Sequence, residues 1–506
     1  MNTTIRSLLI ANRGEIAVRV IRACKELGIR TVTLYSDPDR NAPHVLSADE
    51  AYRIGPASSR ESYLRMDAII ETAKIAGCDA IHPGYGFLSE NAAFARAVTA
   101  SGLIFIGPPA DVIELMGDKT SARRLMIQRG VPVVPGTESA VTSPDEAEHI
   151  AMEVGYPVLL KAAAGGGGKG MRVVEHPSEI RKSLESAQNE ARSAFGDDRV
   201  YIEKFVLQPR HVEIQVLSDT HGNHLHLGER ECSIQRRHQK VVEESPSVIV
   251  NSEMRARMGK AATEAARACG YVNAGTIEFL VDADRNFYFL EMNTRLQVEH
   301  PVTEMVTGID VVKMQILVAE GKPLPFTQSD IAFRGHAIEC RICAEDVRSN
   351  FLPDTGVLRR YRPPQGFGVR EDSGVAEGSE ISIHYDPMFA KLVTWGMDRS
   401  DAIRKMRRAL DEYVIDGVET TIPFCRFVMD HPKFNDGDFQ IDFVQKYFRP
   451  EFLRHPTDEE RLAAVLASVF AEEDKTGDRK ASSIVNGSGA ESCSPWLLRH
   501  RQGGER

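Results

Sequence analysis

The chain has 506 residues, 42% hydrophobic and 26% charged, which is typical of a globular protein with roughly three domains. Its formal net charge of -10 at pH 7 argues against a surface for nucleic acids or anionic membranes. Eight cysteines are too few for a disulfide framework, and no apolar run approaches the roughly 18 residues of a membrane span.

The N-terminal region, to about residue 115, predicts a doubly wound α/β domain on a parallel sheet. The predicted elements are a strand at 7–11, a helix at 15–27, a strand through 32–34, a helix near 63–76 and a strand at 80–81. Strand sequence this close to the N-terminus leaves no room for a targeting peptide and, with the scattered cysteines, predicts a cytoplasmic protein. Gly14 is the only turn glycine at the first βα junction. A dinucleotide fingerprint needs G-x-G-x-x-G there, which argues against a Rossmann-type cofactor site.

Residues 135–203 predict a compact module of strand, glycine-rich loop, strand and helix. The loop at 165–170 reads Gly-Gly-Gly-Gly-Lys-Gly, and without Cβ atoms it can bring backbone N–H groups against phosphate oxygens. A Walker A loop would need glycine at 163 and Ser or Thr at 170; Ala163 and Gly170 therefore exclude a P-loop NTPase. Lys161 supplies a positive charge for a phosphate, which predicts a lid that closes over ATP. The alternative is a flexible hairpin without a ligand.

A predicted β-hairpin carries two facing carboxylates. If Asp282 pairs with Phe287, Glu278 lies directly opposite Glu291 on one face, with Cβ atoms roughly 5 Å apart. Two such carboxylates repel unless a cation lies between them, and oxygen ligands with spare positions for phosphates suit magnesium. Asn293 shares that face. The alternative is a pair of solvated glutamates on the wet side of a sheet.

The segment after this hairpin predicts an anion site. Arg295, Gln297 and Glu299 alternate toward one side if the chain remains extended, so that Arg295 would bind an anion and Glu299 would act as general base. The alternative is a solvated ion pair in a loop. Residues 229–241 concentrate basic and polar groups, which fits an anionic ligand or an exposed basic strand. For the lone His211, the alternative to a role in ligand binding is a structural role.

The C-terminal part of the chain predicts a mixed segment followed by a tail. Cys340 and Cys343 have the spacing of a redox or zinc pair, but positions three apart on a strand face opposite sides, which predicts structural cysteines. Further on, Thr457 and Glu460 are spaced as a helix capping box. A polar stretch then predicts a flexible linker, and its end at 496–498 is either a docking peptide or disordered filler.

Taken together, these residues resemble the biotin carboxylase family of the ATP-grasp superfamily, from about Ile5 to Tyr447. The matching segments are Ala11–Ala17, His82–Asn91, the four-glycine loop, Gln235–Lys240, Glu291–Pro301, Glu339–Ile342 and Tyr385–Met388. The resemblance implies an α/β and α+β fold. Its expected domains are an N-terminal doubly wound parallel-sheet (pre-ATP-grasp) domain at 1–115, an ATP-grasp domain at 116–334 with a mobile lid at about 135–203, a C-terminal mixed biotin carboxylase domain at 335–446, and a helical and flexible tail at 447–506.

The resemblance also implies roles for individual residues. ATP phosphates would contact Lys119, Lys161, Gly166, Gly167, Gly168, His211 and Lys240, while Glu203, Lys204 and Val206 would hold the adenine and Gln235 and His238 would lie near the ribose. The metal ligands, for Mg²⁺ or Mn²⁺, would be Glu278, Glu291 and Asn293. Bicarbonate and biotin would meet Arg295, Gln297, Val298, Glu299, Arg341 and Tyr85. The implied catalytic residues are Glu299 as base for bicarbonate, Arg341 beside the biotin ureido oxyanion, and Arg295 and Lys240.

The reaction implied by the resemblance is the first half-reaction of a biotin-dependent carboxylase. ATP phosphorylates bicarbonate to carboxyphosphate, which breaks down to carbon dioxide beside the biotin enolate and gives carboxybiotin, ADP and phosphate. No Ala-Met-Lys-Met-like turn for attached biotin occurs; Val312-Lys313-Met314 comes nearest, within a predicted capped helix. Biotin is therefore expected on a separate carrier protein. The second expected partner is a carboxyltransferase subunit, and the expected assembly is a homodimer. The final acceptor, acetyl-CoA, another acyl-CoA, pyruvate or another oxo acid, stays open.

Two other functions remain open from the residues. An ATP-grasp ligase that joins a carboxylate to an amine, or a carbamoyl-phosphate-forming enzyme, would use the same loop and hairpin. A scaffold without activity would show decay of the metal or phosphate ligands, and all of them are present. Arg295 and Glu299, together with Arg341, favour the carboxylase because simpler ligases lack this full set.

Overall fold

The computed structural model describes residues 4–137, 139–141, 143–162, 171–453, 459, 462–463 and 465–468. Residues 1–450 form one compact unit and 451–506 a second. In the second unit the described residues 465–468 are helical, whereas the predicted capping box, linker and docking end lie outside the described residues. No helix in the described part of the chain has the length and apolar character to cross a membrane.

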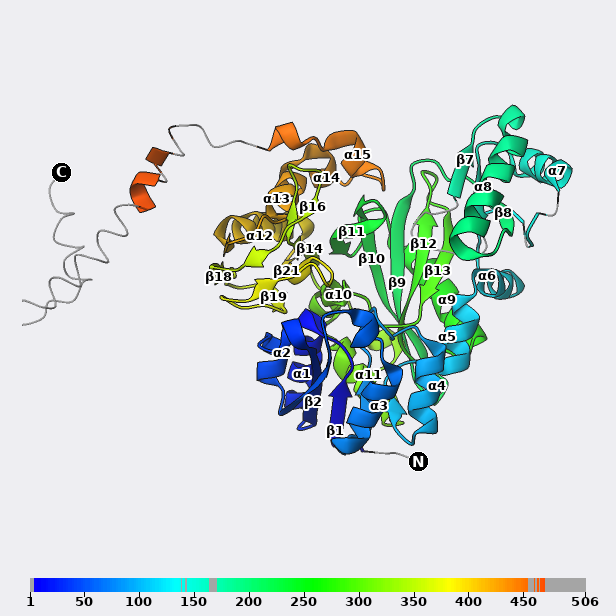
Figure 1. The fold of residues 1–506 in the computed structure, drawn as a ribbon. Coiled ribbons are helices and arrows are strands. Elements are labelled where there is room, and N and C mark those ends of the chain that lie inside the picture. Colours follow the sequence, from blue (N-terminus) through cyan, green and yellow to red (C-terminus); the bar gives the residue numbers. More distant parts are fainter. Residues whose placement is uncertain are drawn as a thin grey trace, which may run out of the picture. The chain divides into compact units, whose positions relative to one another are not determined.

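The N-terminal segment folds as the predicted parallel sheet (Figure 1, blue to cyan). Its elements are β1 (Ser7–Ile10), α1 (Gly14–Glu26), β2 (Arg30–Ser36), α2 (Pro43–Ser47), β3 (Glu50–Gly55), α3 (Met66–Ile75), β4 (Ala80–His82), α4 (Ala92–Ala100), β5 (Ile104–Phe105) and α5 (Ala110–Gly117). The strand order is β3-β2-β1-β4-β5, with every pairing parallel. The prediction of a doubly wound sheet is confirmed, and its strand ends carry the loops that approach the site.

The module predicted at 135–203 contains the predicted strand, second strand and helix, with a helix before them and a strand after them that the sequence did not predict. Its elements are α7 (Pro144–Val154), β6 (Val158–Ala162), β7 (Met171–Val174), α8 (Ile180–Phe195) and β8 (Val200–Lys204). α6 (Lys119–Gln128) precedes the module and packs against the central sheet. β6 is the central strand and pairs antiparallel with β7 and β8. Val158, Leu160 and Ile202 are fully buried against Ala147, Ala151 and Leu184. The glycine-rich loop, with Gly166, Gly167 and Gly168, lies outside the described residues, and closure of the module stays a prediction.

An eight-stranded antiparallel sheet forms the centre of this unit (Figure 1). Its strand order is β13-β12-β9-β10-β11-β14-β21-β19. The strands are β9 (Arg210–Ser218), β10 (His224–Arg236), β11 (Gln239–Ser245), β12 (Asn273–Val281), β13 (Phe287–Asn293), β14 (His336–Cys343), β19 (Val369–Ser373) and β21 (Met388–Gly396). The sheet therefore continues across the predicted domain boundary at residue 334, so that side chains from both segments share one face.

Helices and short strands complete the unit. The remaining helices are α9 (Ser252–Ala268), α10 (His300–Thr307), α11 (Val311–Ala319), α12 (Arg399–Glu412), α13 (Ile422–Asp430), α14 (Pro432–Asn435) and α15 (Phe443–Tyr447). The short strands are β15 (Glu345–Asp346), β16 (Leu352–Pro353), β17 (Gly356–Val357), β18 (Arg360–Arg362), β20 (Glu380–Ile381) and β22 (Val414–Asp416). α9 is not among the elements predicted from the sequence. Its buried Met254, Met258, Ala262 and Ala265 recur at helical spacing, which is the signal that went unused.

The β12–β13 hairpin corrects one part of the predicted register. Glu278 does pair with Glu291, as predicted, but Val281 rather than Asp282 pairs with Phe287. A bulge between the Glu278 and Phe279 pairs inserts one extra residue into β13. The bulge shifts the turn end by one position while leaving the two carboxylates face to face.

Two structural interpretations are confirmed. Cys340 and Cys343 lie on β14 as free cysteines, Cys340 buried. Lys313 belongs to α11, which Asp310 caps by accepting a hydrogen bond from the Lys313 N–H at 2.9 Å.

A buried ion pair in the central sheet predicts a pH-dependent contribution to stability. Burial would raise the pKa of Glu244, but Arg399, whose Nε lies 2.7 Å from the carboxylate, and His336 lower it to about 2. A lowered pKa stabilises the fold above the ordinary value near 4.5, and this contribution is lost as the pH falls from there to about 2. Glu244→Gln should therefore reduce the unfolding free energy by roughly 3 kcal/mol at neutral pH, and the difference from wild type should shrink in acid.

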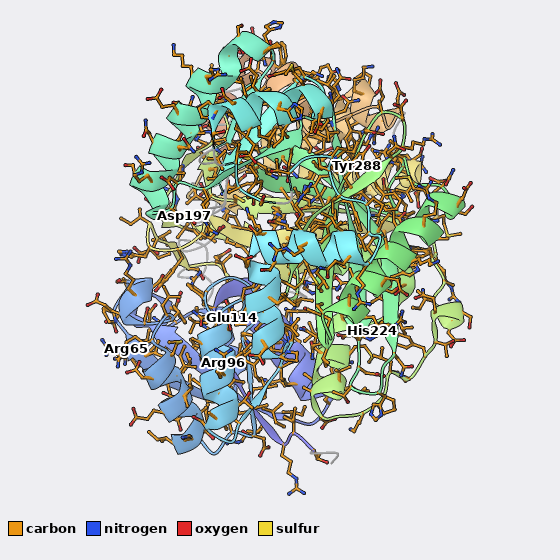
Figure 2. All side chains as sticks on the ribbon, turned by 90° about the vertical axis from the view of Figure 1, so that its right-hand side faces the viewer. Arg65, Arg96, Glu114, Asp197, His224 and Tyr288 are labelled. Atoms are coloured by element: carbon orange, nitrogen blue, oxygen red, sulfur yellow. The ribbon has the colours of Figure 1, made fainter. Side chains whose placement is uncertain are left out.

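Urea denaturation of both proteins across this pH range would measure the effect. Glu114, which pairs with Arg96 at the surface (Figure 2), offers the matched control, because Glu114→Gln should change the unfolding free energy by less than about 1 kcal/mol. A Glu244→Gln deficit that stays constant with pH would contradict the prediction.

Candidate functional site

Lys240 lies at the centre of the site, near the start of β11. Its Nζ contacts Glu213 of β9 at 2.6 Å, Glu278 of β12 at 2.9 Å and Glu299 at 2.7 Å. The lysine side chain is 11% exposed and the Glu299 side chain fully buried. These carboxylates hold the pKa of Lys240 well above its ordinary value despite burial, which would lower it. The ammonium is therefore a permanent positive charge within the site.

Glu299 is held between two cations. Its other carboxylate oxygen accepts a hydrogen bond from Arg341 Nη2 at 2.9 Å, and Arg341 Nε donates to Glu243 at 2.6 Å. Burial would raise the pKa of Glu299, but Lys240, Arg341 and more distant Arg230 hold it well below the ordinary value. Glu299 is thus ionised at neutral pH and can accept a proton only from a group placed beside it.

The extended conformation predicted for this segment is wrong at its end. Glu299 is the N-cap residue of α10, with φ -81° and ψ 14°, so it does not alternate with Arg295 along a strand. Pro301 at the start of α10 favours the helical turn because its fixed φ suits the first turn of a helix. The turn redirects the Glu299 carboxylate toward Lys240.

Arg230 lies next to the cluster formed by Lys240 and the carboxylates of Glu213, Glu278 and Glu299. Its side chain is fully buried, and it donates to Glu213 at 2.5 Å, Gln215 at 2.7 Å and Thr303 at 2.9 Å. The burial of Glu213 between Arg230 and Lys240 fixes both cations relative to each other. Arg230, Glu213 and Glu243 are not among the site residues predicted from the sequence, although Arg230 belongs to the charged segment 229–241.

The predicted metal residues meet at one edge of this cluster. Glu278 receives hydrogen bonds from Lys240 and from Asn293 Nδ2 at 2.9 Å, and His211 Nε2 lies 3.0 Å from its second oxygen. Burial would raise the pKa of Glu278, yet Lys240 and His211 lower it. Burial and the facing Glu278 charge raise the pKa of Glu291, and no described side chain donates a hydrogen bond to it. This oxygen-rich set, with one carboxylate lacking a partner among the described residues, fits a divalent cation that would relieve the repulsion.

Arg295 occupies the adjoining predicted anion site. Its guanidinium contacts Glu90 at 2.9 Å, Gln297 Oε1 at 3.0 Å and Asn293 Oδ1 at 3.1 Å. Gln297 Nε2 reaches Glu278 at 3.4 Å. The structure therefore brings the predicted anion residues and metal residues into one connected group.

The predicted nucleotide residues lie on the lid module and the sheet beside it. Lys161 Nζ donates to Glu203 at 2.8 Å, and Lys204 Nζ donates to the Gly155 carbonyl at 2.7 Å. Gln235 Nε2 lies 2.9 Å from His211 Nδ1. Of the others, Lys119 begins α6, and its charge partly offsets the rise in the pKa of Glu291 that burial and Glu278 cause. Val206 follows β8, and His238 is exposed in the β10–β11 turn.

The loop after β4 brings Tyr85 toward the same region. Asn12 Nδ2 donates to the carbonyls of Pro83 at 2.7 Å and Tyr85 at 2.8 Å. Gly84, with φ +65°, packs so closely that a Cβ there would lie 2.8 Å from the Asn12 amide nitrogen. A side chain at 84 would therefore displace the loop that holds Tyr85.

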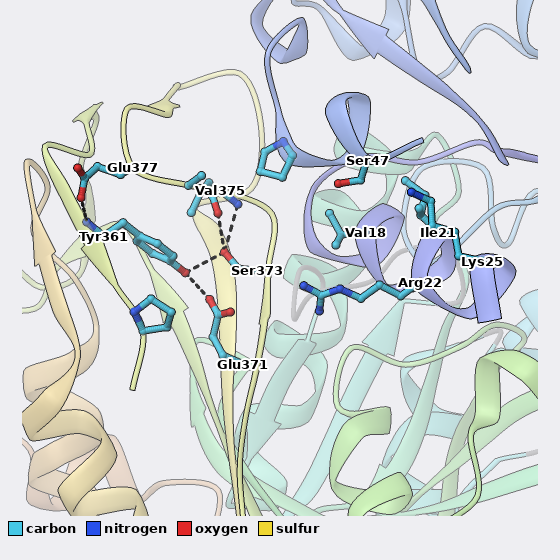
Figure 3. Close-up of a pocket in the computed structure, with 13 residues that line it drawn as sticks. Val18, Ile21, Arg22, Lys25, Ser47, Tyr361, Glu371, Ser373, Val375 and Glu377 are labelled. Carbon is cyan, nitrogen blue, oxygen red and sulfur yellow. Dashed lines mark hydrogen bonds between the residues drawn. The ribbon is translucent and has the colours of Figure 1, made fainter. Parts of the chain in front are cut away.

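A separate cavity of about 470 Å³ lies between α1 and the strands β18 and β19 (Figure 3). Tyr361 donates to Glu371 at 2.5 Å and lies 2.8 Å from Ser373, while Arg22 and Lys25 face them from α1. None of the residues predicted for ATP, metal, bicarbonate or biotin lines it.

Three family models cover most of the chain. Residues 4–113 match the biotin carboxylase N-terminal domain, 118–327 the ATP-binding domain of the carbamoyl-phosphate synthase L chain, and 339–446 the biotin carboxylase C-terminal domain. The ATP-binding model is named for a different enzyme, whereas the two flanking models are both named for biotin carboxylase.

Individual relatives agree with these models. The chain is 54% identical to biotin carboxylase 1 of Bacillus subtilis, over 88% of this chain and 99% of that protein. It is 55% identical to one of the subunits of pyruvate carboxylase from Methanothermobacter thermautotrophicus, over 87% and 90%.

Solved structures show the same similarity. Biotin carboxylase of Campylobacter jejuni, in a β-γ-ATP complex, superimposes with a TM-score of 0.84 at 49% identity, covering 88% of this chain and 99% of that one. The biotin carboxylase domain dimer of Hydrogenobacter thermophilus 2-oxoglutarate carboxylase, with MgADP, ADP and bicarbonate, gives 0.84 at 48% identity, covering 90% and 99%.

Proposed function

The chain belongs to the biotin carboxylase family, and from that premise we propose that it uses ATP and bicarbonate to carboxylate biotin on a separate carrier protein. The observation that carries the proposal is the ionised, buried Glu299 between Lys240 and Arg341. A ligase that activates a carboxylate has no proton to remove from it, whereas bicarbonate carries an O–H proton, and its removal by a general base makes bicarbonate a stronger nucleophile.

The geometry supports a sequence of steps in which the residues of this chain bind and move protons. Arg295, Gln297 and the Val298 backbone hold bicarbonate, and Glu299 takes its proton. The bicarbonate oxygen attacks the γ-phosphorus of ATP, the bond to the β-phosphate oxygen breaks, and carboxyphosphate and ADP form. Carboxyphosphate divides into carbon dioxide and phosphate, and the phosphate accepts the N–H proton of biotin. Arg341 then stabilises the ureido oxyanion while the biotin nitrogen attacks carbon dioxide.

Glu278, Glu291 and Asn293 would hold Mg²⁺ or Mn²⁺, which neutralises phosphate charge when bound. Lys161 and His211, with Lys240, lie where they would face the phosphates. Glu203 and Lys204 on the lid side, with Val206, would receive the adenine, and Gln235 and His238 the ribose. Lys119 would meet the phosphates from α6, and Tyr85 would line the biotin side.

This function requires two partners, a biotin carrier protein and a carboxyltransferase, and we propose a homodimer as the assembly. One solved relative is described as a domain dimer. Relatives named for pyruvate and for propionyl-CoA leave the acceptor open between an oxo acid and an acyl-CoA.

The proposal is tested by ADP release from the purified chain with magnesium, ATP and bicarbonate, with and without free biotin. Turnover should require bicarbonate and rise with biotin. Turnover that ignores both, but responds to an added amine, would instead assign the chain to the amine-ligase class.

A further inference from the structure

Lys391 is a fully buried lysine that no sequence motif marked. It lies on β21, directly opposite Arg341 in the register with β14. Its Nζ donates to the Val298 carbonyl at 2.8 Å and pairs with Glu15 Oε1 at 3.0 Å. A buried ammonium without partners is strongly unfavourable, so these two contacts determine where the side chain can lie.

Glu15 connects Lys391 to Tyr85. It stands in the first turn of α1, with its side chain 2% exposed, and the oxygen that faces Lys391 also accepts the Tyr85 hydroxyl hydrogen bond. A Cβ added to Gly374 would lie 2.5 Å from the Glu15 nitrogen. The end of β19, the strand that pairs with β21 and its Lys391, therefore packs directly onto the start of α1. This contact leaves Glu15 little freedom to shift relative to Lys391.

Each carbonyl of the turn before α10 has its own partner. The Gln297 carbonyl lies 2.8 Å from His300 Nδ1, and the Glu299 carbonyl accepts from the Val302 N–H at 3.4 Å. Both of these contacts come from α10 itself. Lys391 holds the Val298 carbonyl from a different part of the fold.

We propose that Lys391, held in place by Glu15, is a positioning residue for the bicarbonate pocket. It fixes the orientation of the Val298–Glu299 peptide and, through Glu15, the position of that peptide relative to Tyr85. The inference rests on the proposed function. The Val298 carbonyl and the Glu299 N–H belong to one peptide plane. A change in the orientation of that plane alters the ψ of Val298 and the φ of Glu299, the backbone angles on which the placement of the Glu299 carboxylate between Lys240 and Arg341 depends.

The informative variant is the double substitution Glu15→Gln with Lys391→Met. It removes both charges of the pair together, so neither Lys391 nor Glu15 is left facing an apolar replacement, while the Val298 carbonyl loses its lysine contact. Asp372, which also lies in the field of Lys391, keeps its ion pair with Arg370 at 2.6 Å. Lys405→Met is the matched control, because Lys405 also donates to a backbone carbonyl of β21, that of Trp395 at 3.0 Å. All proteins would be compared at a temperature where thermal melts show them folded.

The readout is ADP release as a function of bicarbonate and, separately, of ATP. The double variant should lose on the order of 10²-fold in kcat/KM for bicarbonate, with the KM for ATP unchanged, and Lys405→Met should match wild type. A wild-type kcat/KM for bicarbonate in the double variant would overturn the inference, as would equal losses for both substrates. Wild-type enzyme without bicarbonate dependence would instead overturn the proposed function.

Discussion

Glu299→Gln is expected to lower bicarbonate-dependent ADP release by about 10²–10⁴-fold, the range for loss of a general base. The amide has nearly the shape of the carboxylate but cannot accept the bicarbonate proton. ATP should still bind with an unchanged KM, because Glu299 meets Lys240 and Arg341 rather than the predicted adenine residues. Steady-state kinetics at saturating ATP measures the change.

Glu304→Gln provides the control on the same helix. Glu304 is a buried carboxylate that pairs with Arg19 at 2.9 Å and Arg370 at 2.7 Å, so its substitution removes a similar ion pair without touching the site. Its activity per folded molecule should remain that of wild type. If the two variants lose activity equally, the effect of Glu299→Gln is structural and the assignment of the base is wrong.

The sequence allowed the main carboxylate pair to be predicted because the signal is local. Glu278 and Glu291 belong to one hairpin, and alternation on adjacent strands places them face to face even though a bulge changes the turn. The same reasoning failed at Glu299, where alternation was extended through a segment that turns into α10. Pro301 marks that change, and a helix start signal was the better reading of it.

The charged residues around the base could not be predicted in the same way. Glu243 meets Arg341 because β11 pairs with β14, although the β12–β13 hairpin and the helices α9, α10 and α11 lie between them in the sequence. Lys391 and Glu15 lie far apart in the sequence, on β21 and α1. Such contacts depend on strand order in the antiparallel sheet and on the packing of α1 against it. A buried lysine has the same local sequence signature as an exposed one.

Lys240→Met is expected to lower turnover by about 10²–10³-fold at neutral pH, as removal of a preorganised cation does in other active sites. Lys240 is the largest favourable influence on both Glu299 and Glu278 against their burial. Without it the pKa values of both carboxyls rise toward or above the ordinary value, so a larger fraction of Glu299 is protonated at a given pH and cannot act as base.

The pH dependence of activity distinguishes an effect of Lys240 on the pKa of Glu299 from a general structural effect of the substitution. In wild type the low pKa of Glu299 keeps the base ionised, and activity is lost only as the pH falls toward that low value. In Lys240→Met the acid limb of kcat/KM for bicarbonate should move to higher pH, with part of the lost rate regained toward alkaline pH. Lys240→Arg keeps the charge but not the ammonium geometry, so its rate should fall while its acid limb stays near that of wild type. An unshifted acid limb in Lys240→Met would show that Lys240 acts on the phosphates alone, because only its action on Glu299 links the lysine to the protonation of the base.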